Sequence, residues 1–144
     1  MRVTKFTDYA LRVLIYLACK PSGELTTISQ LAEAYSISVH HVRVVVHKLG
    51  QAGYISSTPG KGGGVELALK PDEILIGEVI RSTEKDFFIV ECFNPQGKCT
   101  IVKACRLKHI LGDALNAFID TLDQYTLADI TDNRHEIVQQ IKVA

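Results

Sequence analysis

The sequence predicts a mainly α-helical protein with one small β-hairpin, and three observations lead to this fold class. Three segments within the first 53 residues place apolar side chains at intervals of three and four, as amphipathic helices do. Residues 54–69 alternate apolar and polar side chains around a glycine-rich turn. Residues 102–124 carry a broad apolar stripe at helical spacing, so a long helix follows later in the chain.

The first two predicted helices are bounded by clear start and stop signals. Helical periodicity runs from about residue 4 to residue 19, and the sequence KPSGEL then ends the helix. A second, short helix follows Thr27, which is suited to cap it. Gln30 lies three residues later, as in a capping box.

The third predicted helix follows the turn SIS, where Ser38 is placed to cap it, and it ends at Gly50 or Gly53. Its β-branched run weakens helix propensity, so this helix rests on its context more than on its composition. One apolar stripe is expected to face the core: Val39, Val42, Val46 and Leu49.

A hairpin is predicted from the alternation in residues 54–58 and 65–69, which PGKGGG connects. The predicted elements follow the order of a winged helix-turn-helix: helix, short helix, turn, helix and hairpin. In that motif the second helix of the pair enters the DNA major groove and the hairpin forms the wing. The turn lacks the GxxxxGK[ST] spacing of a phosphate-binding loop. No nucleophile–base pairing is apparent either, so we expect a binding protein rather than an enzyme.

Charge is unevenly divided although the net charge is zero. Residues 1–65 carry seven Lys/Arg and three Asp/Glu, whereas residues 66–144 carry nine and thirteen. Residues 36–64 contain no acidic side chain, which favours a polyanion partner for the N-terminal half. The expected contacts to double-stranded DNA come from the third helix and the wing: Ser38, His40, His41, Arg43, His47, Lys48 and Lys61.

Two of these residues have specific expected roles. The guanidinium fork of Arg43 matches O6 and N7 of guanine, and a phosphate contact is the equally weighted alternative. Lys61 is the single charged residue in PGKGGG, where its glycine neighbours allow close approach to a narrow minor groove.

The N-terminus indicates a cytoplasmic protein. It lacks a signal-peptide cleavage site, and Asp8 and Arg12 interrupt its apolar residues. No apolar run is long enough to span a bilayer, so no membrane partner is expected. Cysteines of an intracellular protein are reduced by default, which argues against a disulfide framework.

Three cysteines, Cys92, Cys99 and Cys105, lie in one polar loop with the spacing C-x6-C-x5-C. A role as small buried hydrophobes suits Cys19 but not these three. Zinc sites usually need a close cysteine pair, and a thiol–disulfide switch would leave one thiol over. Iron–sulfur ligation suits the wide spacing, because thiolates must approach a cluster from different sides. A fourth ligand then comes from elsewhere, or one iron stays open.

Five segments over nearly the whole chain carry a resemblance to a known family: TKFTDYALRVLIYLA, LGQAGYI, PGKGGGVELA, ACRLKHIL and LDQYTLADI. The chain resembles the iron–sulfur winged-helix transcriptional regulators, which include IscR and RirA, and among them the nitric-oxide-sensing repressors. The resemblance implies a homodimer that represses transcription from inverted-repeat operators. It also implies a [4Fe–4S] cluster on Cys92, Cys99 and Cys105, with Asp8 of the partner subunit as fourth ligand.

Two alternatives stay open. IscR-like proteins hold a [2Fe–2S] cluster with a histidine close after the third cysteine, and His109 lies four residues after Cys105. A [2Fe–2S] or iron-availability sensor of the same fold is therefore one alternative. A zinc-stabilised or thiol-active interaction protein is the other. We expect residues 1–83 to form the winged helix-turn-helix domain, and residues 84–144 the cluster-binding loop and a dimerisation helix.

Overall fold

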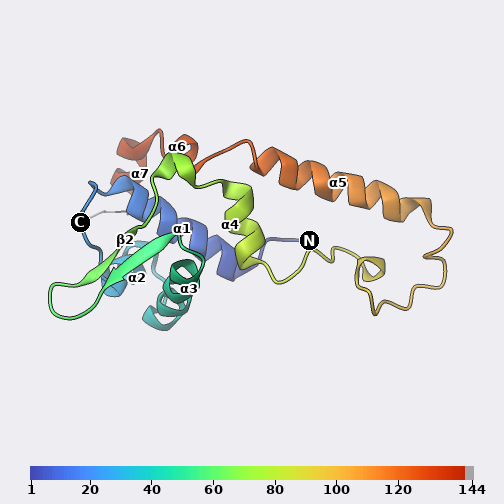
Figure 1. Ribbon diagram of the computed structural model, residues 1–144, viewed down its shortest axis with the longest axis horizontal. Helices are drawn as coiled ribbons and strands as arrows, with labels where there is room; N and C mark the ends of the chain where they lie inside the picture. The colour runs from blue at the N-terminus through green and yellow to red at the C-terminus, as the bar shows by residue number, and fades with distance from the viewer. Residues whose placement is uncertain (142–144) are drawn as a thin grey trace.

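The computed structural model describes residues 1–141 of the 144-residue chain. Figure 1 shows one compact body from which α5 and the cysteine loop extend. This mainly helical architecture with a single hairpin confirms the predicted fold class. No helix in residues 1–141 is both long and apolar enough to cross a membrane. The elements are α1 (Lys5–Cys19), α2 (Ile28–Tyr35), α3 (Val39–Gln51), β1 (Ile55–Thr58), β2 (Gly64–Leu67), α4 (Ile76–Thr83), α5 (Arg106–Leu122), α6 (Leu127–Ile130) and α7 (Arg134–Ile141), with 3₁₀ turns at Pro71–Glu73 and Glu91–Phe93.

Side-chain caps begin the first three helices, and the caps of the second and third are the residues that the sequence indicated. The hydroxyl of Thr4 accepts a hydrogen bond of 3.3 Å from a first-turn amide of α1. Thr27 and Gln30 form the predicted capping box of α2, with bonds of 3.1 and 2.8 Å. Ser38 accepts a bond of 3.2 Å at the start of α3. These bonds satisfy amides that the first helical turn leaves unpaired, so these helix starts are encoded locally.

The main core is built around α1, which contacts α2, α3, α4, α6, α7 and β2. Val42, Val46 and Leu49 of α3 are buried against it, as predicted. The expectation for Val39 was wrong, because this side chain is 40% exposed and Val45 is buried instead. The two valines lie about 60° to either side of Val42 around the helix axis. Direction around the axis does not explain the difference, because Val46 lies only about 20° from Val39 and is buried. Val39 is exposed because it is the first residue of α3, at the end of the helix.

The predicted wing is present as the antiparallel pair β1–β2, in which Thr58 lies opposite Gly64. Its connection, residues 59–63, requires glycine for conformational reasons. Gly60 and Gly62 have φ values of +89° and +77°, a region that L side chains rarely adopt. The hairpin tip therefore consists of backbone with few side chains, and it projects away from the body (Figure 1).

Helix α5 begins four residues later than the periodicity suggested. Residues 99–104 form tight turns, in which the amide of Ala104 donates to the carbonyl of Ile101 at 3.0 Å, and Cys105 directly precedes the helix. Apolar residues continued the helical pattern upstream, but periodicity alone does not fix a helix start. At the other end, Arg81 of α4 donates two bonds of 2.7 and 2.6 Å to Asp123 and so fastens α5 to α4.

The C-terminal segment returns to the first part of the chain. Leu127 of α6 is fully buried in the main core, and its amide donates to the carbonyl of Ile74 at 2.8 Å. Helices α6 and α7 both pack against α1. The division after residue 83 remains a prediction, to which the structure adds that residues 126–141 share the core of the N-terminal part. Residues 142–144, the end of the expected last helix, lie outside the described residues.

Candidate DNA-binding surface and cysteine loop

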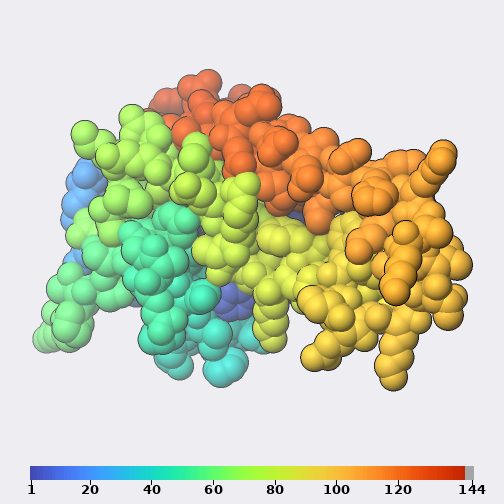
Figure 2. All heavy atoms as spheres, turned by 45° about the vertical axis from the view of Figure 1, so that its right-hand side comes forward, coloured from blue at the N-terminus to red at the C-terminus, as the bar shows by residue number. Residues whose placement is uncertain are grey.

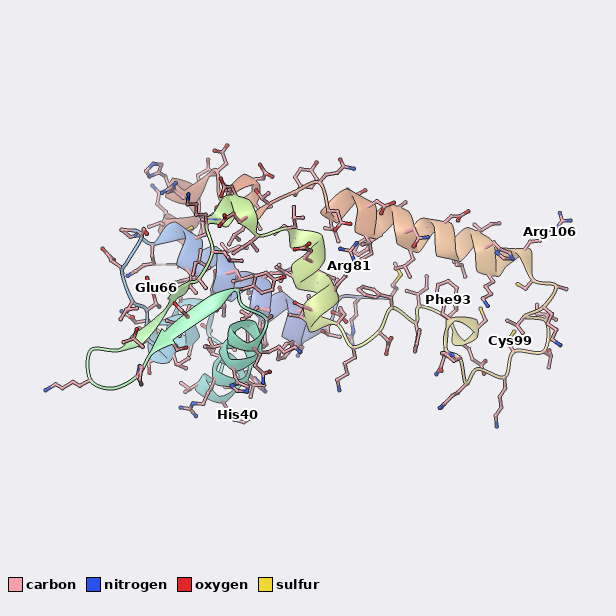
Figure 3. All side chains as sticks on the ribbon, viewed as in Figure 1. His40, Glu66, Arg81, Phe93, Cys99 and Arg106 are labelled. Atoms are coloured by element: carbon pink, nitrogen blue, oxygen red, sulfur yellow. The ribbon has the colours of Figure 1, made fainter. Side chains whose placement is uncertain are left out.

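Helix α3 presents its charged face to solvent. Val42, Val45 and Leu49 are each at most 1% exposed and fix the opposite face against the core. All of the polar positions predicted to contact DNA on this helix are exposed: Ser38, His40, His41, Arg43, His47 and Lys48. Figure 3 shows His40 pointing away from the body at the lower edge of the molecule. The structure thus brings the predicted α3 residues together on one outer surface.

His41 is the member of this set that also touches a neighbouring helix. Its ring lies 6.2 Å from the ring of Tyr9 in α1, and 6.0 Å from the ring of His40. Burial of one side of α3 against α1 brings these rings together. His41 therefore connects the outward surface of α3 to the first helix.

The wing adds one further cation to this side of the molecule. Lys61 is exposed at the tip, between two glycines with positive φ. The nearest acidic residues along the chain are Glu33 and Glu66, so no carboxylate interrupts α3 or the wing tip. Figure 2 shows the teal atoms of α3 and the green atoms of the hairpin beside one another on the body. This surface has the charge and the shape of a nucleic-acid interface.

The cysteine loop folds through local backbone bonds. Cys92 lies in the 3₁₀ turn Glu91–Phe93, and the Glu91 carboxylate accepts a hydrogen bond of 3.0 Å from the Lys98 amide. Gly97 packs so closely that a Cβ there would collide with the carbonyl oxygen of Glu91. Figure 3 shows Cys99 in this loop, near the N-terminal end of α5. Cys105 thus directly precedes α5, whereas Cys92 lies in a turn whose Phe93 approaches Gly112 in the middle of that helix.

The three loop thiols differ from Cys19 in their surroundings. All four cysteines are free, but only Cys19 is buried, while Cys92, Cys99 and Cys105 are partly exposed. Burial raises the pKa of the Cys19 thiol, and the positive charge of Arg134 opposes this shift. Cys19 therefore stays protonated as a small core residue.

The loop cysteines fit an iron–sulfur cluster by their chemistry. They are free and partly exposed thiols on one connected segment. Cys105 occupies the N-cap of α5 without a side-chain cap bond, so unpaired first-turn amides are available to stabilise a thiolate. In residues 1–141 no three His, Cys, Asp or Glu side chains converge closely enough to hold a metal ion. The donor set is suitable, and holding a cluster requires the loop to draw its thiols together.

Asp8 lies in the first turn of α1 and is paired within its own chain. Its carboxylate accepts hydrogen bonds from Arg12 at 3.1 and 2.9 Å, and its side chain is 46% exposed. Arg12 in turn lies 5.9 Å from the ring centres of both Tyr9 and Tyr35. The sequence reasoning missed this pairing, although the i,i+4 spacing signals it. Figure 1 shows α1 well separated from the cysteine loop of the same chain.

An apolar groove of about 550 Å³ runs beside α5. Residues 1–4 and 86–89 line one side, and Leu111, Leu115 and Phe118 line the other. Leu107 and Ile110 of the same helix are 57% and 62% exposed. The apolar face predicted for this helix is therefore largely uncovered in a single chain.

Comparison with known proteins decides the family. The chain matches Rrf2, described as an iron-dependent transcriptional regulator, over residues 3–133. The chain belongs to the Rrf2 family. The HTH-type transcriptional regulator NsrR of Bacillus subtilis (strain 168) is 49% identical over 144 residues, which are 99% of each chain. The NsrR of Bacillus licheniformis is 50% identical over 138 residues, 95% of this chain and 96% of the relative.

Solved structures agree with the Rrf2 assignment. CymR, the global cysteine regulator of B. subtilis, has a TM-score of 0.74 at 26% identity and covers 92% of this chain and 98% of its own. IscR of T. potens shares the fold, with a TM-score of 0.74 at 22% identity, over 95% of this chain and 90% of its own. This Rrf2 protein is a DNA-binding transcriptional regulator and not an enzyme. The resemblance seen in the sequence is confirmed.

Proposed function

We propose that this Rrf2 regulator is a cytoplasmic iron–sulfur repressor that senses nitric oxide and binds inverted-repeat operators as a homodimer. The observation that carries the proposal is the set of three free, partly exposed thiols in the one segment that leads into α5. Relatives about half identical in sequence and named NsrR support it, as does the iron-dependent description of the family. Cys92, Cys99 and Cys105 hold a [4Fe–4S] cluster, and Asp8 of the partner subunit supplies the fourth ligand. When bound, the cluster supplies iron that reacts with nitric oxide.

The uncovered apolar face of α5 supports the proposed homodimer. A long amphipathic helix with several large apolar side chains exposed to water gains stability by packing on another copy. The groove between the N-terminal segment and α5 offers a receiving surface in the same region. A ligand from the partner subunit further requires this packing to place the cysteine loop of one subunit beside α1 of the other.

Asp8 has two alternative partners under this proposal, Arg12 of its own chain and iron in the partner subunit's site. An exposed i,i+4 ion pair contributes only about 0.3–0.5 kcal/mol, so Asp8 leaves Arg12 at little cost. Because α1 packs directly on α3, a constraint on Asp8 also bears on the orientation of α3. A coupling of roughly 1–3 kcal/mol between the sites changes DNA affinity about 5–150-fold.

The DNA contacts follow from the exposed surface of α3 and the wing. α3 enters the major groove, where Arg43 contacts guanine or a phosphate, and Lys61 reaches the minor groove. Two recognition helices in a dimer contact successive major grooves about 34–36 Å apart. The dimer thereby matches an inverted repeat.

The decisive experiment tests whether operator binding depends on the cluster and is lost after nitric oxide. Protein purified without oxygen is analysed for its visible spectrum, iron and sulfide, and its affinity for operator DNA is measured before and after nitric oxide. We expect about four irons per subunit and a loss of affinity after nitric oxide. Colourless protein without iron contradicts the proposal. Two irons per subunit, lost in His109→Ala, would instead favour the [2Fe–2S] alternative, because exposed His109 lies one turn after Cys105.

A further inference from the structure

An apolar side chain occupies the centre of the outward, cationic face of α3. Val44 is 45% exposed, and exposed His40 and Lys48 lie one helical turn before and after it. Helical geometry places Val44 roughly opposite Val42 and Leu49, which face the core. Val44 therefore contributes little to the core, and its β-branch weakens the helix that carries it. Its exposure leaves the isopropyl group accessible to a binding partner.

The chemistry of the major groove supplies that role. Polar side chains read the donors and acceptors on base edges, whereas thymine alone among the four bases presents a methyl group there. An isopropyl group at the centre of a recognition helix is suited to pack on this methyl. We propose that Val44 reads a thymine methyl group in each operator half-site. The inference rests on the proposed assignment of α3 as the recognition helix, and it adds a specificity residue that the polar pattern did not reveal.

The surroundings of Val44 favour DNA over a protein surface as the occupant. Exposed His40, Arg43, His47 and Lys48 lie close to it along the helix, and residues 34–65 contain no Asp or Glu. Burying this set in an apolar protein interface would strip the cations of water without an anion to pair with them. Phosphates flank the major groove and pair with such cations while the valine reaches a base.

Val39 is a matched comparison within the same helix. It is also a valine and is 40% exposed, but it is the first residue of α3 and lies about 140° around the axis from Val44. It therefore borders the outward face instead of lying at its centre. The same valine-to-alanine change at both positions shows whether an effect on DNA binding depends on where the valine lies on the helix or only on the loss of its side chain.

The test removes single methyl groups from the DNA. Full-length protein, purified without oxygen, selects its binding sequence from a random duplex library, and each thymine of one half-site is then replaced by deoxyuridine. We expect the wild-type protein to lose about three- to tenfold in affinity at one or two adjacent positions. Val44→Ala should show no loss at those positions, whereas Val44→Ile and Val39→Ala should keep it. Alanine is the better helix former, so Val44→Ala remains folded.

Two results overturn the inference. One is a wild-type protein indifferent to every deoxyuridine, and the other is an equal loss in wild type and Val44→Ala. Arg43→Ala and Lys48→Ala on the unmodified duplex identify which assumption failed. If both variants bind like wild type, α3 is not the recognition helix and the proposed DNA contacts fail too. If they bind more weakly while Val44→Ala keeps the deoxyuridine loss, only the role of Val44 is wrong.

Discussion

At the scale of single residues, the exposure of a thiol separates a structural cysteine from a ligand. A metal ligand must lose its proton and reach solvent-borne iron, and Cys19 in the core of α1 is unsuited to both. The loop cysteines are partly exposed, and Cys105 lies beside unpaired amides at a helix start. The same residue type thus packs in the core at one position and is a candidate metal ligand at three others.

We therefore expect Cys92→Ala, Cys99→Ala and Cys105→Ala each to abolish stable cluster binding, and Cys19→Ala to retain it. Removing one of three thiolates leaves too few strong ligands, whereas Cys19 makes no contribution beyond packing. Iron and sulfide per subunit, together with the visible spectrum, measure the effect after purification without oxygen. Full iron content in any variant of the loop cysteines would contradict the assignment.

Asp8 gives a second residue-level prediction. Asp8→Ala should keep a cluster, because three thiolates remain, but the cluster should be lost faster and react with nitric oxide at a changed rate. The decay of visible absorbance with time measures both. Glu24→Ala is the matched control, because Glu24 is a half-exposed carboxylate in another i,i+4 pair, 3.3 Å from Lys20. Equal rates in Asp8→Ala and wild type would exclude Asp8 as a ligand from the partner subunit.

At the scale of elements, local signals predicted more than long-range packing did. Thr27 and Ser38 were predicted as the caps of α2 and α3 because a cap acts within one turn, whereas the capping role of Thr4 was not predicted. The start of α5 was misplaced because cysteine is not among the usual capping residues, so nothing in the sequence marked Cys105 as the N-cap. The burial of Leu127 in the main core depends on contacts between distant segments, which periodicity does not encode.

For the candidate site, too, local features were predictable from the sequence and long-range contacts were not. Residue type and spacing identified the cysteine triad and the basic helix, since both are properties of a short segment. The partners of each side chain were not predictable to the same degree. The placement of His41 against Tyr9 depends on how α3 crosses α1. Val44 was overlooked because a valine in a helix is first read as core, and its exposure became visible only in three dimensions.

The wing is an element whose function is testable by salt dependence. Lys61→Ala should weaken operator binding and reduce the slope of log affinity against log salt by about one. The glycines beside Lys61 leave it as the long side chain of the tip, so the variant removes one phosphate contact per subunit. Lys85→Ala, which removes an exposed lysine outside α3 and the wing, should leave the slope unchanged. An unaltered slope in Lys61→Ala would mean that the wing tip does not touch DNA.

At the scale of the whole molecule, the single chain is divided between a well-packed body and an exposed arm. The body buries its apolar residues around α1, and α6 and α7 also pack against this helix. α5 leaves that body with its apolar face open, fastened at one end by the Arg81–Asp123 pair. This arrangement holds the cysteine loop away from its own α1. Our proposal therefore has the loop act on DNA binding through a second subunit.

Phe118 tests this dependence on a second subunit. It is 45% exposed in one chain, so Phe118→Glu should be tolerated by the monomer, whose folding circular dichroism will check. In a dimer the carboxylate would be buried without a partner, and we expect the dimer dissociation constant to rise at least about 100-fold. Sedimentation over a range of protein concentrations measures the dissociation constant. Asn116→Glu adds the same charge at an exposed position on the polar side of α5 and should remain dimeric.

Operator binding should fall together with the dimer. A monomer contacts one half-site and loses the advantage of two linked recognition helices, so the inverted repeat should bind no better than a single half-site. Titration of Phe118→Glu against duplexes with one and two half-sites makes this comparison directly. Cys105 lies 13 residues before Phe118, more than three helical turns along α5, and the variant replaces none of the three loop cysteines. A dimeric Phe118→Glu with wild-type operator affinity would show that the apolar face of α5 is not the subunit interface.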